Sequence, residues 1–135
     1  MSVDDIVAFR PGSGIAHRPD WGAAASPDWD ETEWRAFGSE DGPYMGGSWT
    51  GQPGTLLCNP YPYDEVCIMI SGRVALIDTE GQRREFSAGD AFFVPKSFTG
   101  TWETLVPSEK YFIALIGSQA AAKTSGSARQ ESRIT

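Results

Sequence analysis

Turn signals recur along most of this chain, and they limit what it can fold into. From Tyr44 onward, short apolar runs are separated by clusters of Gly, Pro, Asn, Asp and Ser at intervals of roughly eight to twelve residues. The clusters lie at 51–54, 59–60, 71–72, 79–82, 88–90 and 96–100. The runs between them are too short for ordinary helices and are typical of the strands of a sandwich or a barrel.

The composition agrees with a single all-β domain. The 135 residues include 15 Gly and 9 Pro, which interrupt helices and favour tight turns. Hydrophobic residues make up 40% of the chain and include 5 Trp, so a core can form without disulfides or a structural metal. The two cysteines, Cys58 and Cys67, show no CxxC spacing, and we expect them to be buried thiols.

Charge and hydropathy exclude two classes of partner. The formal net charge is −7, whereas binding to nucleic acid through its phosphates needs a basic surface. The longest mostly apolar stretch, 66–77, is interrupted by polar residues and is too short to span a bilayer. The acidic N-terminus lacks the basic and apolar regions of a secretory signal. We therefore predict a cytoplasmic protein that binds neither nucleic acid nor membranes.

The chain divides into three predicted parts. Residues 1–42 have no sustained period but carry three Trp, so we expect an irregular arm that packs on the barrel, with 34–37 as its one strand. Residues 43–117 are predicted to form the folded domain. Residues 118–135 are small and polar, which predicts a flexible tail.

The apolar run at 66–70 predicts a strand with two apolar faces. Alternation places Glu65, Cys67 and Met69 on one face and three aliphatic side chains on the other. The run 111–116 has the same character. In a small antiparallel protein, the outward apolar face needs cover from the arm or from a second subunit. We therefore predict a homodimer.

Two motifs flank a predicted hairpin. Glu65 begins a strand that ends at Gly72, and Gly89 opens a segment that ends at Pro95. Glu-x6-Gly followed by Gly-x5-Pro resembles the two signature motifs of the cupin superfamily. The resemblance covers about 43–116, and the motifs are specific in combination. The residues at 46–54 and 98–111 are similar to one branch, which contains the ethanolamine-utilisation cupin and ureidoglycine aminohydrolase-like proteins. It implies a double-stranded β-helix, a small jelly-roll barrel with the active site at one mouth.

The resemblance also implies a divalent metal, which cupins usually bind through a His-x-His pair, the motif Glu and a third His. Here these three histidine positions hold other residues: Asn59 and Tyr61, or Cys58 and Pro60, and then Gly100. Only Glu65 is kept, and the single histidine, His17, lies in the arm. One carboxylate is a poor site for a transition metal, so we expect no metal and no cofactor. The alternative is a weak divalent site with His17 or Cys58 folded toward Glu65.

Glu65 is the candidate catalytic residue. An inward carboxylate among apolar neighbours, with no metal beside it, tends toward a raised pKa and can serve as a general acid or base. The alternative is a structural role, with Glu65 held by strand backbone or by Lys110.

Five residues are candidate ligand contacts. Trp49 and Trp102 beside one carboxylate would suit a small ammonium-bearing ligand, and ordinary packing is the alternative for both. Tyr61 and Tyr63 can supply phenol groups at the rim. Lys110 completes the set, with a structural pair between Lys110 and Glu103 as its alternative.

Two functions follow as hypotheses. The first is a small-molecule-binding cupin that lacks the usual histidine ligands and has no assignable catalytic activity. The second is a metal-independent lyase, isomerase or aminohydrolase, in which Glu65 moves a proton on a small polar or amine-containing metabolite.

Overall fold

The computed structural model describes residues 1–117, so the predicted tail at 118–135 lies outside the described residues. Within 1–117 the only helices are two short 3-10 helices, η1 (Val3–Asp5) and η2 (Gly22–Ala24), and neither is long enough to cross a membrane. The remaining elements are ten strands: β1 (Ile15–His17), β2 (Glu31–Gly38), β3 (Tyr44–Gly51), β4 (Gly54–Cys58), β5 (Asp64–Ser71), β6 (Arg73–Asp78), β7 (Arg83–Ser87), β8 (Ala91–Val94), β9 (Gly100–Thr104) and β10 (Ser108–Leu115).

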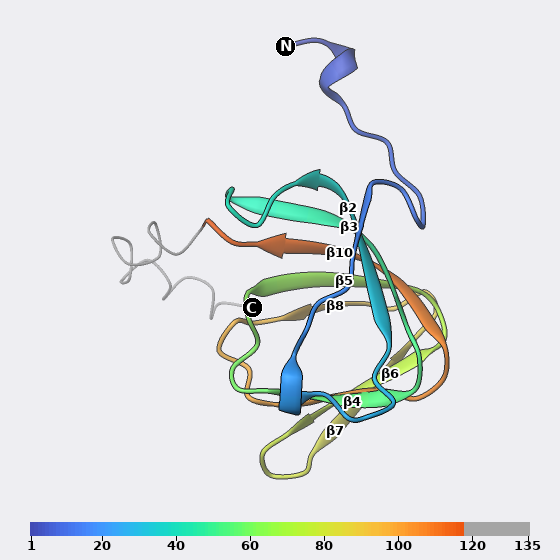
Figure 1. Ribbon diagram of the computed structural model, residues 1–135, viewed down its shortest axis with the longest axis vertical. Coiled ribbons are helices and arrows are strands. Elements are labelled where there is room, and N and C mark those ends of the chain that lie inside the picture. The colour runs from blue at the N-terminus through green and yellow to red at the C-terminus, as the bar shows by residue number, and fades with distance from the viewer. Residues whose placement is uncertain (118–135) are drawn as a thin grey trace.

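The strands form two antiparallel sheets that enclose the interior of the molecule (Figure 1). One sheet has the order β1-β2-β3-β10-β5-β8, and the other has the order β4-β9-β6-β7. Each turn cluster between 51 and 100 separates two consecutive strands, as the sequence predicts. The jelly-roll β fold is therefore confirmed.

The segment before residue 43 contributes more to the main sheet than the sequence indicates. The strand expected at 34–37 is the second half of β2, which begins at Glu31 and pairs with β3 along most of its length. A further strand, β1, pairs with β2 and forms the edge of the sheet. Each of these strands is fixed by pairing with another segment of the chain, which its own residues reveal only in part. Figure 1 shows the first residues, in blue, extending away from the two sheets.

The alternation predicted for β5 is present in the structure. Cys67 and Met69 point into the core and are almost fully buried, whereas Ile68 on the opposite face is 39% exposed. The arm covers part of this outer face, because the ring of Phe9 packs edge-on against Tyr111 with centroids 5.4 Å apart. The homodimer stays a prediction.

The structure explains why position 72, in the turn between β5 and β6, is a glycine. Its φ of +84° lies in the left-handed region, which favours glycine. A Cβ at this position would come within 2.2 Å of the Ser108 hydroxyl oxygen. The glycine of the Glu-x6-Gly motif therefore allows β5 to turn directly into β6, with Glu65 at the other end of the strand.

Candidate ligand-binding site

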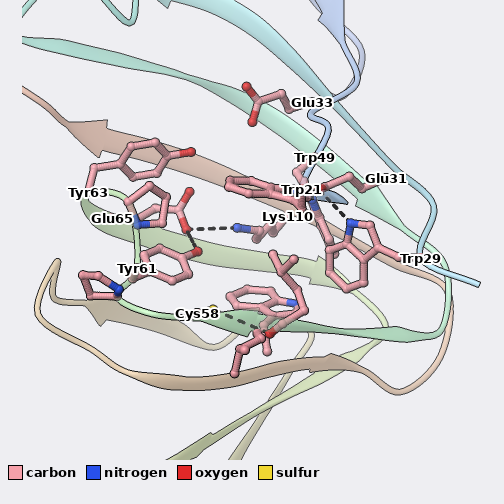
Figure 2. A pocket seen from close by; sticks show the side chains of 15 residues that line it. Trp21, Trp29, Glu31, Glu33, Trp49, Cys58, Tyr61, Tyr63, Glu65 and Lys110 are labelled. Atoms are coloured by element: carbon pink, nitrogen blue, oxygen red, sulfur yellow. Dashed lines mark hydrogen bonds and ion pairs between the residues drawn. The ribbon is translucent and has the colours of Figure 1, made fainter. Parts of the chain in front are cut away.

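A cavity of about 150 Å³ lies inside the barrel, and its wall combines aromatic rings with charged side chains (Figure 2). Four Trp and two Tyr form most of the aromatic wall. The charged residues are Glu31 and Glu33 from β2, Glu65 from β5 and Lys110 from β10. A cavity of this volume can hold a molecule of the size of benzene, roughly six non-hydrogen atoms.

Glu65 lies at the centre of a buried hydrogen-bond network. Its side chain points inward from β5, and the residue is 3% exposed. Oε1 accepts hydrogen bonds from the Tyr61 hydroxyl, from Cys67 Sγ at 3.2 Å and from Lys110 Nζ at 3.3 Å. Oε2 has no hydrogen-bond partner within residues 1–117, and it carries no dashed line in Figure 2. One carboxylate oxygen is thus held by the protein, and the other remains open to a ligand.

Lys110 forms an ion pair with Glu65 in the interior, where it is 3% exposed. Burial lowers the pKa of Lys110, but Cys67 and Glu65 raise it by a larger amount and leave it above its ordinary value. The ammonium lies 4.6 Å from the ring centroid of Trp102 and 5.1 Å from that of Trp49, within cation–π range. Lys110 therefore remains a cation, packed between two indole rings.

The alternative pair between Lys110 and Glu103 is wrong. Glu103 instead bonds Arg83 at 3.1 Å on the outside of the smaller sheet. Alternation along β10 directs Lys110 into the interior, away from the surface on which Glu103 lies. The structural alternative for Glu65, in which Lys110 holds it, matches the observed contact.

Three indole groups bind a second buried carboxylate, that of Glu31. Trp49 donates to Oε1 at 2.6 Å, and Trp21 and Trp29 donate to Oε2 at 2.5 and 2.7 Å. Glu31 is 8% exposed, and it forms no ion pair within residues 1–117. Its negative charge is held by N–H donors alone.

Glu33 and Tyr63 complete the polar wall. Burial raises the pKa of Glu33, although the hydrogen bond and charge of Arg35, 2.7 Å away, oppose this effect. Burial also raises the pKa of the Tyr63 phenol, and the charges of Glu65, Glu33 and Glu31 raise it further. Tyr63 is therefore a neutral phenol.

The donor set does not fit the metal that the resemblance implies. Within residues 1–117, no three His, Cys, Asp or Glu side chains come together as a metal site. His17 is exposed on β1. The one implied ligand that is present, Glu65, already faces the ammonium of Lys110, which would repel a second cation.

All six candidate residues from the sequence line this one cavity: Glu65, Trp49, Tyr61, Tyr63, Trp102 and Lys110. Their roles in binding or catalysis stay predictions. The structure adds one fact about Trp49 and Trp102, because the cation that lies over these rings is the protein's own Lys110. An ammonium group of a ligand would have to bind elsewhere in the cavity.

The part of the cavity wall formed by the arm is not among the residues predicted from the sequence. Trp29, Glu31 and Glu33 alternate with other residues, and this spacing places them on one face of a strand. The strand expected at 34–37 begins too late to include this alternation, whereas β2 begins at Glu31. Trp21 lies in an irregular segment beside η2, and its spacing carries no comparable signal.

Both cysteines are free and buried, as predicted. Burial raises the pKa of Cys58 to about 11 and raises that of Cys67 well above its usual value. At pH 8 the Cys58 thiolate is then on the order of 100-fold scarcer than that of an ordinary cysteine. We expect iodoacetamide to alkylate Cys58 in the native protein at least that much more slowly than in urea, with a rate that rises up to about pH 11. Mass spectrometry of the labelled protein checks this, and equal rates with and without urea at pH 8 would contradict it.

The two antiparallel sheets enclose a cavity lined by aromatic and charged side chains, and the Glu-x6-Gly segment forms strand β5 and its turn. These features define a cupin-type barrel. Residues 38–112 match the model of the EutQ-like cupin domain. The chain belongs to this family, and the predicted branch is confirmed. None of the curated protein sequences matches it.

Solved structures show the same fold. The EutQ protein of Clostridium difficile is 21% identical and has a TM-score of 0.62 over 74% of this chain and 76% of its own. A putative ethanolamine utilization protein Q of Salmonella typhimurium is 18% identical and has a TM-score of 0.55 over 64% of this chain and 70% of its own. A predicted oxalate decarboxylase of Thermotoga maritima is 13% identical and has a TM-score of 0.61 over 81% of this chain and 98% of its own. At these identities the likeness concerns the fold alone.

Proposed function

We propose that this protein is a small-molecule-binding cupin that works without a bound metal and has no catalytic activity of the usual cupin type. The observation that carries this proposal is the contact between the Lys110 ammonium and Glu65 Oε1, at 3.3 Å. It supplies a positive charge at the carboxylate on which other cupins place a metal. The cavity beside it has room for a compact ligand.

The polar wall supports a ligand with hydrogen-bonding groups. Glu65 Oε2 and the hydroxyl of Tyr63 have no hydrogen-bond partner within residues 1–117. Both residues line the cavity, together with Leu56 and several aromatic rings. Pockets of this kind fix a ligand by a few polar contacts within a largely apolar wall.

The first part of the test concerns the metal. Elemental analysis of the purified protein is expected to find far less than one transition-metal ion per chain, and a chelator is expected to leave the melting temperature unchanged. A stoichiometric metal ion that is lost on Glu65→Gln substitution would contradict the proposal.

The second part of the test concerns the ligand. In a thermal-shift screen of small neutral, acidic and basic molecules, a binder raises the melting temperature as its concentration passes the Kd. Leu56→Phe, which fills part of the cavity, is expected to abolish the shift. The control is Leu115→Phe, because Leu115 is exposed and lies outside the cavity wall. A shift that survives Leu56→Phe would place the ligand elsewhere.

The second candidate function, a metal-independent enzyme, is favoured by one feature of Glu65. Its Oε1 holds Tyr61, and its unpaired Oε2 can take a proton from a bound molecule or return one. Once a binder is known, Glu65→Gln separates the two functions. If the wild-type protein converts the bound molecule, and the variant still binds it but no longer converts it, the protein is an enzyme.

A further inference from the structure

We infer that the ligand of this cavity is a small organic cation with a single positive charge, bound at Glu31. This inference rests on the proposed small-molecule function and names the class of the ligand. It follows from the charges around the cavity, from the hydrogen bonds of Glu31 and from the position of Lys110.

The charges around the cavity do not balance. Lys110 pairs with Glu65 at 3.3 Å, and Arg35 pairs with Glu33 at 2.7 Å. Glu31 has no cationic partner within residues 1–117, although it is buried like the other two carboxylates, at 8% exposure against 5% for Glu33 and 3% for Glu65. Because a buried charge is costly unless it is paired, a monocation beside Glu31 would remove the imbalance.

The hydrogen bonds of Glu31 leave room for one more donor. An ionised carboxylate offers about four acceptor sites. Trp21 and Trp29 share Oε2, whereas among the described residues 1–117 Oε1 accepts only from Trp49. The three N–H donors stabilise the negative charge without neutralising it. A cationic donor at Oε1 would add both the missing hydrogen bond and the missing charge.

Lys110 decides where in the cavity such a cation binds. Its ammonium already lies over the rings of Trp49 and Trp102 and beside Glu65. Repulsion between like charges directs a second cation away from this end. Figure 2 shows Glu31 and Trp29 on the side of the cavity opposite Glu65. There the rings of Trp21 and Trp29 form a wall that suits an alkylammonium group through cation–π contacts.

This subsite comes from outside the matched family domain. The family model covers 38–112, whereas Trp21, Trp29 and Glu31 precede it. The core of the domain supplies the barrel and the Glu65–Lys110 pair, and the arm supplies the group that selects the charge of the ligand. Chains that share the domain but differ in the arm would then accept other ligands.

The test compares molecules that have the same shape but differ in charge. Choline is paired with 3,3-dimethylbutan-1-ol, and n-propylamine with propan-1-ol, at neutral pH. Titration calorimetry or ligand-observed NMR gives each Kd on the full chain. In one pair or the other, the cation is expected to bind about 10- to 100-fold more tightly than its neutral counterpart. n-Propylammonium can donate a charge-assisted hydrogen bond to Glu31, whereas the quaternary ammonium of choline has no N–H and tests charge and cation–π contact alone.

Two variants locate the effect. Glu31→Gln removes the charge and keeps an acceptor for the indole groups, and it is expected to reduce the preference for the cation at least tenfold. Glu80→Gln changes the net charge equally in the exposed turn between β6 and β7, and it is expected to leave the preference unchanged. The wild-type comparison does not need a variant, so it stands even if Glu31→Gln fails to fold.

Each outcome has one meaning. Equal binding within both pairs, or an unchanged preference in folded Glu31→Gln, overturns the cation assignment. Binding of neutral or acidic molecules in the cavity without binding of cations overturns the assignment but leaves the small-molecule function intact. Absence of binding across neutral, acidic and basic molecules overturns the proposed function itself.

Discussion

Replacement of Lys110 with Met is expected to lower the free energy of unfolding by about 3–5 kcal/mol, the usual cost of removing one partner of a buried ion pair. Methionine keeps much of the apolar stem but removes the ammonium that lies 3.3 Å from Glu65. Both side chains are almost inaccessible to water, at 4% and 5% exposure, so solvent does not screen the loss. The carboxylate would remain buried without a cation.

Urea denaturation of a short series checks this prediction. The double variant Lys110→Met with Glu65→Gln is expected to recover part of the loss, because no unpaired charge remains. Lys96→Met is the matched control, since Lys96 makes no ion pair within residues 1–117. A loss below about 1 kcal/mol for Lys110→Met, the range of an exposed pair, would show that the ion pair is not buried in solution.

Replacement of Glu31 with Leu is expected to cost about 2–4 kcal/mol, because three indole N–H groups lose their acceptor together. The Trp49 donor is fully buried, whereas those of Trp21 and Trp29 are partly buried and cost less to leave unpaired. A leucine has a similar volume, so the cavity term is small.

Two further substitutions test whether the loss of stability in Glu31→Leu comes from its hydrogen bonds. Trp49→Phe removes one donor, keeps an aromatic ring and is expected to cost less than Glu31→Leu. Glu109→Leu on β10 controls for the loss of a carboxylate that accepts no hydrogen bond from these indole groups. If Glu31→Leu proves as stable as wild type by urea denaturation, the three hydrogen bonds do not contribute to stability.

Much of the barrel was predictable from the sequence because its signals are local. Turn residues mark each boundary from β3 to β9, and alternation in β5 assigns Glu65 and Cys67 to the interior. The arm was less predictable. β1 forms by pairing with β2, and β2 forms by pairing with β3, so only 34–37 was expected as a strand.

Six residues that line the cavity were predicted from the sequence, whereas the residues from the arm were not, and the contact between Glu65 and Lys110 was expected only as an alternative. Glu65 and Lys110 were both named, yet they are 45 positions apart and meet only because β5 and β10 are neighbours in one sheet. Glu31 is likewise brought to Trp49 by the pairing of β2 with β3. Spacing in the sequence does not encode such cross-strand partners, which require the sheet order.

The aromatic wall has a consequence for how this protein can be observed. Four of the 5 Trp line the cavity: Trp21, Trp29, Trp49 and Trp102. Three of them donate hydrogen bonds to one carboxylate, and the ring of the fourth lies under an ammonium group. Indole emission responds to nearby charges and to the loss of water, so the intrinsic fluorescence of the chain is itself a gauge of whether the barrel is filled.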